Sequence, residues 1–288
     1  MPVETRRFDS VDAFLDVAGP FLEAREPEHM LTLGILGERR AQNSWPRDGV
    51  LVAAHVDGRV VATALWTQPW NVVLSEIADA RAVDALAAAF ATDPLGGVHA
   101  PAEHADSFAR AWTSRTGRTY RPTSRQRSYV VESVTPPRDV PGSLRRAQTE
   151  DRDRMVEWMV AFDREAMGSE SRRQDMTAFV DGMLTSPART GYLWEVDGTP
   201  VSMCQAVGPT PHGIRVGAVY TPPGRRGRGY ASACVAAVSR IELDAGRRWC
   251  FLFTDLSNPI SNRIYRRIGY EPVRDVDIYR FERATVSD

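Results

Sequence analysis

Two segments of the chain share one pattern of apolar and polar positions: an apolar run, an Asp-Gly pair and a second apolar run. They are Val50–Val56, Asp57-Gly58 and Val60–Thr67 in the first half, and Tyr192–Val196, Asp197-Gly198 and Val201–Val207 in the second. Asp-Gly between apolar runs is a strong hairpin signal, because a type I′ turn needs positive φ at both central residues. The pattern therefore predicts two β-hairpins, about 140 residues apart.

The elements after each hairpin also follow the same order: a helical stretch, another helix and a closing strand. The helical stretches are Arg81–Ala91 and Tyr230–Ala245, and the closing strands are Ser128–Val134 and Asp277–Glu282. Hairpins are common enough for chance to produce two, but the matched order favours an internal duplication.

A proline-rich segment separates the two halves. Residues 135–142 contain three prolines and a glycine, which cannot sustain a helix or an interior strand. We therefore predict a domain over residues 1–135, a linker over 136–142 and a second domain over 143–288. The predicted fold class is α+β, with two tandem domains, each a mixed, mainly antiparallel sheet flanked by helices.

Composition and charge exclude several classes of protein. The chain of 288 residues is 43% hydrophobic and 25% charged, which is typical of a globular protein and excludes a disordered chain. Its 36 basic and 37 acidic residues give a net charge of −1, so no overall field attracts nucleic acid or an anionic membrane. We expect neither as a partner.

The cysteines and the first residues predict the compartment. Cys204, Cys234 and Cys250 are odd in number and lie in apolar runs, which is typical of buried free thiols in a reducing compartment. Residues 1–10 are charged and lack the apolar core of a signal peptide, and no apolar run is long enough to span a membrane. We expect a cytoplasmic protein.

An arginine- and glycine-rich turn in the second half carries the strongest chemical signal. The apolar strand Gly213–Thr221 stops at two prolines, and the turn 225–229 leads into the helix that follows. A strand, a glycine-rich turn and a helix N-terminus bind anions well, since unpaired N–H groups and the helix dipole point at the ligand. Gly227 and Gly229 would let the backbone approach an anion closely. The alternative is a solvated basic loop that only caps the helix.

Two motifs give this turn a family resemblance. It matches neither the P-loop nor the dinucleotide fingerprint, but it fits Arg/Gln-x-x-Gly-x-Gly/Ala at Arg226, Gly229 and Ala231. A second pattern, Asn-x-x-Ala-x-x-x-Tyr-x-x-x-Gly-Phe, is matched at Asn258, Tyr265, Gly269 and Tyr270, with Ser261 in place of Ala and Tyr270 in place of Phe. The pair of motifs resembles the GNAT superfamily of N-acetyltransferases. The whole chain looks like the two-domain bacterial members, in which a degenerate N-terminal copy precedes a complete C-terminal one.

The resemblance implies acetyl-CoA as co-substrate and no metal. The pantetheine arm would add to the edge of the strand at 219–221, and the pyrophosphate would take N–H groups of 226–231. Asn258 would bond the pantetheine or, alternatively, only cap the helix that begins near Pro259. The implied cofactor-binding residues are Val219, Tyr220, Thr221, Arg226, Gly227, Arg228, Gly229, Tyr230, Ala231 and Asn258.

For catalysis, the resemblance implies direct attack of an uncharged amine on the thioester in a ternary complex. Tyr265 is the candidate general acid for the leaving thiolate, and its alternative role is packing against the coenzyme. The base is less defined, since the strand before the loop has no carboxylate. The candidates are a water relay and the four carboxylates Asp163, Glu165, Glu170 and Asp255.

The first half lacks the phosphate loop. Its corresponding junction, Leu74–Asp79, carries acidic residues where the second half has arginine and glycine, and these would oppose pyrophosphate. We therefore predict no cofactor site there. Its four tryptophans could line a substrate pocket, although core packing is expected for at least two: Trp45, Trp66, Trp70 and Trp112.

The sequence thus predicts an acetyl-CoA-dependent N-acetyltransferase that acts on the primary amine of a small molecule. Alternatives within the same chemistry are a protein lysine or N-terminal acetyltransferase, and an O-acetyl or longer-acyl transferase. An alternative from another class is a non-catalytic acyl-CoA sensor. Exposed sheet edges in this fold also allow a homodimer.

Overall fold

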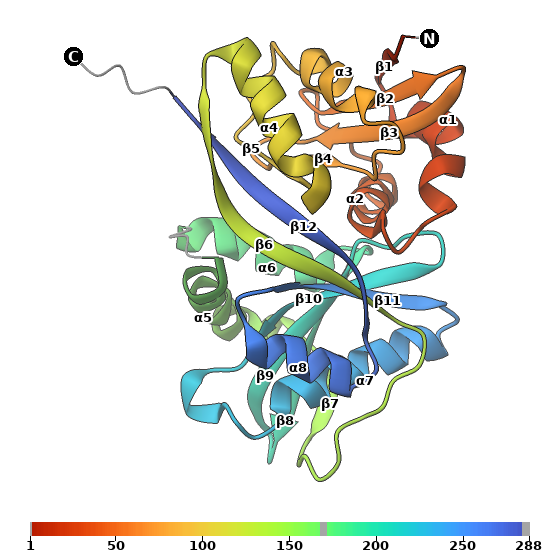
Figure 1. Ribbon diagram of the computed structural model, residues 1–288. Helices are drawn as coiled ribbons and strands as arrows, with labels where there is room; N and C mark the ends of the chain where they lie inside the picture. The colour runs from red at the N-terminus through yellow and green to blue at the C-terminus, as the bar shows by residue number, and fades with distance from the viewer. Residues whose placement is uncertain (1, 168–171, 284–288) are drawn as a thin grey trace, which may run out of the picture. The chain divides into compact units, whose positions relative to one another are not determined.

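The structure is a computed structural model that describes residues 2–167 and 172–283. Its chain divides into two compact units (Figure 1). The first unit comprises Met1–Ser128, Phe253–Asn258 and Pro272–Asp288, and the second comprises Tyr129–Leu252 and Pro259–Glu271. The first unit therefore includes residues from the end of the chain. The predicted division at residues 136–142 would place those residues in the second domain.

The two halves of the chain repeat one order of elements. The first half contains β1 (Glu4–Phe8), α1 (Val11–Glu23), α2 (Met30–Ala41), β2 (Val50–Val56), β3 (Arg59–Trp66), β4 (Val72–Leu74), α3 (Arg81–Ala89), β5 (Gly97–Pro101), α4 (Ala102–Thr116) and β6 (Thr119–Val131). The second contains β7 (Ser143–Arg146), α5 (Arg152–Phe162), α6 (Arg173–Thr185), β8 (Arg189–Val196), β9 (Thr199–Val207), β10 (Gly213–Tyr220), α7 (Tyr230–Asp244), β11 (Trp249–Asp255), α8 (Pro259–Arg267) and β12 (Glu271–Glu282). Three short helical turns accompany them in the second half: η1 (Thr149–Asp151), η2 (Asp163–Met167) and η3 (Pro223–Arg225).

Both predicted hairpins are confirmed. The pair β2–β3 and the pair β8–β9 are each antiparallel and joined by an Asp-Gly turn. Asp57 and Gly58 have φ of 51° and 73°, and Asp197 and Gly198 have φ of 48° and 71°. All four central residues therefore have the positive φ that a type I′ turn requires.

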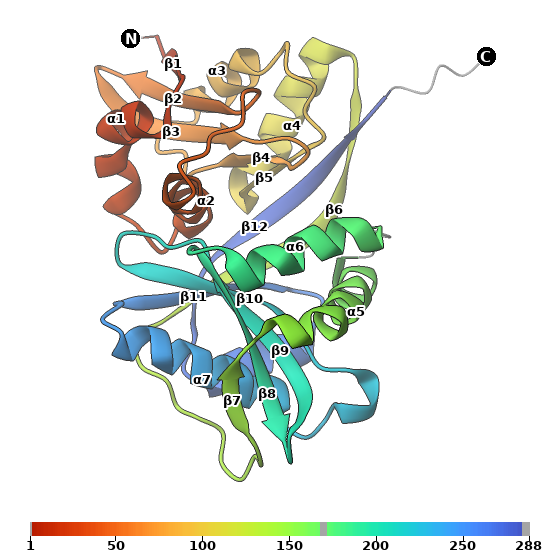
Figure 2. The same ribbon diagram turned by 180° about the vertical axis from the view of Figure 1, so that it is seen from behind.

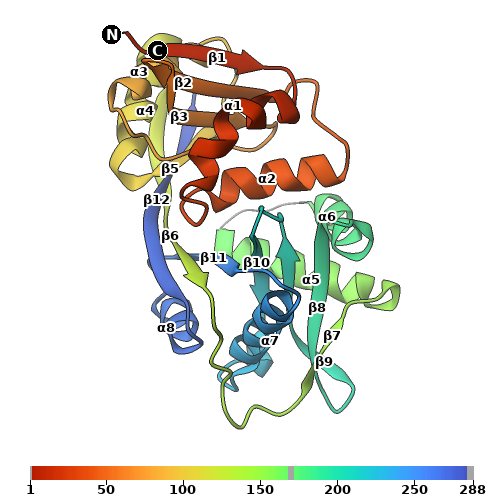
Figure 3. The ribbon, with the colours of Figure 1, turned by 90° about the vertical axis from the view of Figure 1, so that its right-hand side faces the viewer.

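The sheet of the first unit is covered by helices on both faces. Its strand order is β1-β2-β3-β4-β5-β12-β6, and only β4 and β5 are shown pairing in parallel. Alternate residues of β2 point to opposite sides: Val52 and Ala54 pack with α3 and α4, whereas Leu51 and Ala53 pack with α1 and α2. Figure 3 shows these two helix pairs on either side of the strands.

The second unit repeats this layering. Its strands follow the order β11-β10-β9-β8-β7, with β10 parallel to β11 and the other neighbours antiparallel. One apolar cluster joins this sheet to α7 and α8, and another joins its opposite face to α5 and α6. Figure 2 shows α5 and α6 over that second face. The predicted α+β class with mainly antiparallel sheets is confirmed.

The last strand pairs inside the first unit. Residues Val276 to Arg280 of β12 run antiparallel to Pro101 to Gly97 of β5. The predicted closing strand of the second half thus supplies a strand next to β5 in the first unit.

The proline-rich segment, residues 135–142, belongs to the second unit and packs within it. Trp194 Nε1 donates a hydrogen bond to the carbonyl of Pro141 at 2.9 Å. Nearby, Val140 packs against the backbone of Gly229, where an added Cβ would lie 2.8 Å from Val140 Cγ2. The segment thereby contacts the turn that carries the first family motif.

The three cysteines are buried and free, as predicted. Cys204 and Cys234 lie side by side in the core of the second unit, with 3.4 Å between their sulfur atoms. Within the described residues, no helix combines the length and apolar character needed to cross a bilayer.

Candidate functional site

The C-terminal end of β10 departs from regular strand geometry. Its parallel register with β11 runs from Gly213 to Arg215, so the rest of the strand extends past that pairing. Against β9 the register shifts between Gly217 and Tyr220, where Ala218 has a φ of 50°. A bulge of this kind re-aims side chains and leaves backbone groups unpaired. The end of β10 thus offers a strand edge of the type that an amide chain could join.

Immediately after β10, the backbone forms a cradle with the features of an anion site. The turn η3 uses the N–H groups of Arg225 and Arg226, which donate to Pro222 and Pro223 at 2.8 and 3.2 Å. Beyond it, Gly227 has a φ of 77°, and Gly229 caps α7 with a φ of 81° and no side-chain capping bond. The first N–H groups of α7 therefore have no capping side chain, and the helix dipole favours an anion there.

Space and charge at this cradle fit a pyrophosphate. A Cβ on Gly227 would meet no atom within 4 Å, so the space in front of its backbone is open. The side chains of Arg225 and Arg228 are exposed beside it and can pair with phosphate oxygens. The predicted N–H donors at 227–231 remain suitable, whereas that of Arg226 is used by η3.

Glu165 joins this cradle to the end of β10. It lies in η2, a π-helical turn, and its two carboxylate oxygens accept from the Tyr220 hydroxyl and from Arg226 Nη2. Arg226 Nε also donates to the carbonyl of Thr221 at 2.8 Å, and its guanidinium carbon lies 5.6 Å from the centre of the Tyr220 ring. Glu165 thus contacts two predicted cofactor-binding residues, Tyr220 and Arg226, and Arg226 bonds a third, Thr221.

The Arg226 pair sets the ionisation of this cluster. Its hydrogen bond and charge lower the pKa of Glu165, which keeps the carboxylate ionised at neutral pH. Burial, followed by the charge of Glu165, raises the pKa of Tyr220, so that phenol keeps its proton. The bonds of Glu165, one of the predicted carboxylates, place it beside the cradle, where it acts as an ion-pair partner.

Tyr265 lies in the core of the second unit. Its side chain is buried beside the ring of Tyr270, with ring centres 6.1 Å apart and edge-to-face geometry. Burial raises the pKa of Tyr265. The phenol therefore stays protonated and can serve as a proton donor.

The remaining candidates lie at the start of α8 and in η2. Asn258 is exposed and its N–H donates to the Asp255 carbonyl at 3.1 Å, directly before α8. Asp255 Oδ1 accepts from the N–H and the hydroxyl of Ser257 at 2.7 and 2.6 Å, which gives it a turn-forming role. Asp163 begins η2, and Glu170 lies outside the described residues.

Two neighbours of Tyr220 were not predicted from the sequence. The hydroxyl of Ser202 donates to the Tyr220 carbonyl at 3.1 Å and lies 2.9 Å from Thr221 Oγ1. The Trp158 ring lies 6.2 Å from that of Tyr220. A signal existed for Ser202, because it stands between the apolar residues Val201 and Met203 of β9.

In the first unit, the acidic residues of the corresponding junction, Leu74–Asp79, form ion pairs with arginines. Glu76 pairs with Arg25, and Asp79 pairs with Arg81 at 2.6 Å. Two of the four tryptophans, Trp66 and Trp112, are buried in the core as expected, whereas Trp70 is 64% exposed.

Comparison with known families supports this geometry. The family model of the GNAT acetyltransferases matches residues 152–270. Residues 152–270 are a GNAT acetyltransferase domain. Members of this family transfer an acyl group from acetyl-CoA, which is the activity that the match implies for this domain.

Solved structures match the GNAT fold over almost the whole chain. A Drosophila protein gives a TM-score of 0.69 at 14% identity, over 96% of this chain and 98% of its own. A GCN5-related N-acetyltransferase from Sphaerobacter thermophilus gives 0.61 at 16% identity, over 98% and 95%. A tandem GNAT protein from the clavulanic acid biosynthesis pathway gives 0.54 at 13% identity, over 99% and 100%.

These identities are low, so the likeness concerns the tandem GNAT fold and not the substrate. A comparison with curated protein sequences gives no match.

Proposed function

We propose that the protein is an N-acetyltransferase that moves the acetyl group of acetyl-CoA to the primary amine of a small molecule. The observation that carries this proposal is the cradle after β10. It combines two positive-φ glycines, Gly227 and Gly229, with exposed arginines and the uncapped start of α7. A pyrophosphate is the group that such a cradle fits.

In this proposal, residues of β10 and the cradle bind the coenzyme. Val219, Tyr220 and Thr221 offer main-chain groups past the parallel register, and residues 227–231 offer N–H groups to the pyrophosphate. Arg228 adds charge, and Asn258 bonds the pantetheine. Glu165 holds Arg226 beside the strand end through its ion pair.

The chemical step is direct transfer in a ternary complex. The uncharged amine attacks the thioester carbonyl, a C–N bond forms and the C–S bond breaks. The departing coenzyme thiolate takes the hydroxyl proton of Tyr265, while a water relay removes the proton from the attacking nitrogen. Holding the amine and thioester together supplies much of the rate, and the acid adds typically about 10²–10⁴-fold.

Tyr265 is proposed as the acid because of its place in the second family motif. The phenol keeps its proton at neutral pH, although the burial that raises its pKa also makes it a weaker acid. The ion pair with Arg226 argues against Glu165 as the base, because it lowers the pKa of Glu165 and a carboxylate with a lowered pKa is a weaker proton acceptor.

We further propose that the enzyme works in the cytoplasm without nucleic acid or a membrane as partner, and that it can form a homodimer. Three free, buried thiols support the reducing compartment, and the net charge of −1 supports the absence of polyanionic partners.

The test is release of coenzyme A thiol from acetyl-CoA in the presence of aminoglycosides, polyamines, amino acids, arylamines and lysine peptides. Turnover with one class of small amine is the expected result. Turnover with peptides alone would move the function to protein acetylation. Acetyl-CoA binding by calorimetry without turnover on any acceptor would favour the sensor, and absence of binding would refute the proposal.

A further inference from the structure

One buried amide of the second unit has a polar atom that the fold leaves unpaired. Gln205 lies in β9 and is 4% exposed, and its carbonyl oxygen Oε1 has no hydrogen-bond partner among the described residues. Buried polar groups find a partner in the great majority of cases, because an unmet group costs free energy. This oxygen is therefore a candidate contact for a ligand that supplies a donor.

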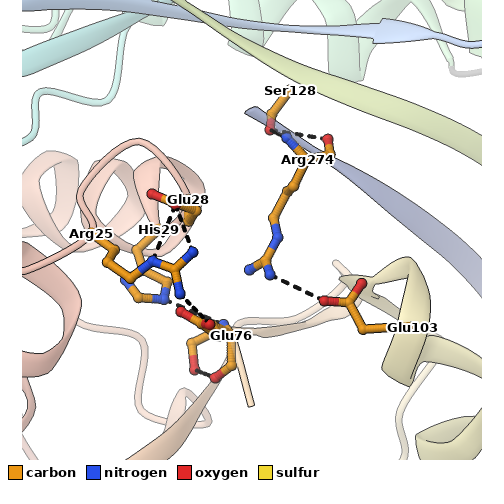
Figure 4. Close-up of polar contacts among 8 residues, drawn as sticks. Arg25, Glu28, His29, Glu76, Glu103, Ser128 and Arg274 are labelled. Carbon is orange, nitrogen blue, oxygen red and sulfur yellow. Dashed lines mark hydrogen bonds and ion pairs between the residues drawn. The ribbon is translucent and has the colours of Figure 1, made fainter. Parts of the chain in front are cut away.

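Unpaired buried polar atoms also occur in two other side chains of the described part of the chain, Thr63 and Arg274. Both residues belong to the first unit. Figure 4 shows the Arg274 side chain extending from its strand towards Glu103, to which its Nη2 donates at 3.1 Å. Arg274 thus has an ion-pair partner in the fold, whereas Gln205 lies in the unit that carries the family motifs.

Gln205 lies on the face of the sheet that α5 and α6 cover. Met203, two residues earlier in β9, belongs to the apolar cluster that joins this face to the two helices, and a strand repeats its side-chain direction every two residues. In the strand register, Gln205 is directly opposite Gly191 of β8 and Gly217 of β10. The amide is therefore flanked by a glycine on each side.

The two glycines differ in what surrounds them. A Cβ on Gly191 would lie 2.9 Å from Met155 Cε, so the apolar cluster closes that side. Gly217 is half-buried, and outside its chain neighbours the nearest atom to a Cβ there would be Arg215 Nη1, at 4.0 Å. Its φ is outside the left-handed region, so the backbone does not require glycine. What glycine provides at this position is free space beside Gln205.

On the proposed function, this space lies level with the acetyl group. The pyrophosphate takes N–H groups of 227–231 and the pantetheine runs back along 221 to 219, so the thioester comes next, near Gly217. By that point β10 has passed its parallel register with β11, which ends at Arg215. An amine that enters over Gly217 would therefore reach the thioester carbonyl and Gln205 together.

We propose that Gln205 Oε1 accepts a hydrogen bond from one N–H of the acceptor and so makes the enzyme selective for primary amines. This inference rests on the proposed function. One N–H of the amine donates to Gln205, and the other loses its proton to the water relay as the C–N bond forms and the C–S bond breaks. The amide product keeps the N–H that faces Gln205. A neutral carboxamide does not take the proton, so its effect is to orient the nitrogen.

The same bond disfavours other acceptors. A secondary amine or an alcohol has a single N–H or O–H, which must be given up, so Gln205 would have no donor as the new bond forms. Sites built around such a hydrogen bond reject analogues that lack it. The guanidinium of Arg215 beside Gly217 also disfavours an ammonium ion and favours the uncharged amine that attacks.

The test measures kcat/KM of the full-length protein for three matched acceptors. They are the primary amine that wild type acetylates fastest in the panel above, its N-methyl derivative and the alcohol of the same skeleton; benzylamine, N-methylbenzylamine and benzyl alcohol are one such set. Gln205→Met removes the carbonyl at similar side-chain volume. Gln148→Met is the matched control, because the Gln148 side chain already accepts the Asp151 N–H in the capping box at η1.

For the primary amine, we expect kcat/KM to fall at least about tenfold in Gln205→Met and to stay within about twofold of wild type in Gln148→Met. The preference of wild type for the primary amine over the N-methyl amine and the alcohol should shrink in Gln205→Met by the same factor. An unchanged kcat/KM, or an equal fall for all three acceptors, would overturn the proposal.

Urea unfolding separates a ligand contact from a structural role. Since Oε1 is unpaired in the fold, Gln205→Met should keep or raise the unfolding midpoint. Gln148→Met should lower the midpoint, because it removes a capping bond. A lower midpoint for Gln205→Met would show that the amide supports the fold, and it would overturn the proposal.

Acetyl-CoA binding distinguishes failure of this inference from failure of the proposed function. By calorimetry, the Kd for acetyl-CoA should be the same in wild type and both variants. Absence of acetyl-CoA binding, or of turnover with any primary amine, would refute the proposed function and this inference with it. Turnover by wild type with an unchanged preference in Gln205→Met would refute this inference alone.

Discussion

The hydroxyl of Tyr220 donates a hydrogen bond to Glu165 Oε1, with 3.2 Å between the two oxygens. The other oxygen of the same carboxylate pairs with Arg226, a residue of the first family motif. A π-helical turn, a strand end and the glycine-rich cradle are thus connected by a single side chain. Because Arg226 lowers the pKa of Glu165, this carboxylate is suited to positioning its partners and not to accepting a proton.

Glu165→Gln should leave the pH dependence of acetyl transfer unchanged. With its pKa held low, Glu165 stays ionised across the neutral range, so a rate increase between pH 6 and 9 must come from another group, such as the substrate amine. We expect the midpoint of the kcat/KM profile for the acceptor to stay the same. Loss of the rate increase between pH 6 and 9 in Glu165→Gln would instead identify Glu165 as the base.

The same substitution should cost little stability. The Glu165 and Arg226 side chains are 32% and 48% exposed, and pairs of this kind contribute about 0–1 kcal/mol. Urea unfolding of Glu165→Gln and wild type at pH 7 measures the difference, and a larger loss would show a structural role for the pair.

Gly227→Asn should weaken coenzyme binding. Asn tolerates positive φ better than other side chains, so the backbone at Gly227 can keep its shape while the new side chain occupies the open space before the cradle. We expect the Kd for acetyl-CoA to rise at least about tenfold, about 1.4 kcal/mol, by calorimetry. Gly224→Asn is the matched control.

Gly224 is a suitable control because a Cβ there meets nothing within 4 Å and its φ is not in the left-handed region. Its variant should bind acetyl-CoA as wild type does. Gly229 is less suitable for this test, since any Cβ there would clash with Val140. Equal Kd values for Gly227→Asn and wild type would contradict the assignment of the cradle.

Tyr265→Phe should lower the turnover rate, whereas Tyr270→Phe should lower the stability. If Tyr265 protonates the leaving thiolate, its loss should lower kcat by about 10²-fold without changing the Kd for acetyl-CoA. Tyr270 makes a 2.7 Å hydrogen bond with Ser239, so Tyr270→Phe should cost about 1 kcal/mol of unfolding free energy with little change in kcat. Steady-state kinetics and urea unfolding of both variants distinguish the two roles, and an unchanged kcat in Tyr265→Phe would remove that residue from the chemistry.

Asp151 should make the stability of the second unit sensitive to acid. Arg145 contacts both of its carboxylate oxygens, at 2.6 and 2.7 Å, and lowers its pKa. The stabilisation is therefore complete above the unfolded pKa of about 3.9 and is lost as the pH falls through the lower folded value. Asp151→Asn should cost about 1–3 kcal/mol at pH 7 and flatten the dependence below pH 5.

The matched control for Asp151 is Asp175→Asn. Asp175 pairs with Arg172 on the surface, where both side chains are well exposed. Its variant should differ from wild type by less than about 0.5 kcal/mol in urea unfolding at pH 7. Equal losses for the two variants would mean that the buried position of Asp151 contributes nothing.

Local patterns were enough to predict much of this fold. Asp57-Gly58 and Asp197-Gly198 form the expected turns because the required backbone angles depend on these residues alone. The helix after the cradle begins at Tyr230, as the glycines and the apolar period predicted. The family match over residues 152–270 agrees with motifs that were visible in the sequence.

The tertiary structure decided how distant residues meet. Glu165 was one of four equivalent carboxylates in the sequence, and only the folding of η2 against β10 brings it to Arg226, 61 residues away. Likewise, no local pattern places Val276–Arg280 beside β5, because strand pairing depends on which edge is open and not on the strand's own residues.

The sequence by itself determined the repeat of hairpin and helix, the GNAT motifs and the cradle, since these depend on short-range backbone preferences. Only the tertiary structure decided that β12 returns to the first unit, where it pairs with β5. Strand pairing depends on which edge of the sheet the rest of the fold leaves open, and segments far apart in the sequence build that edge.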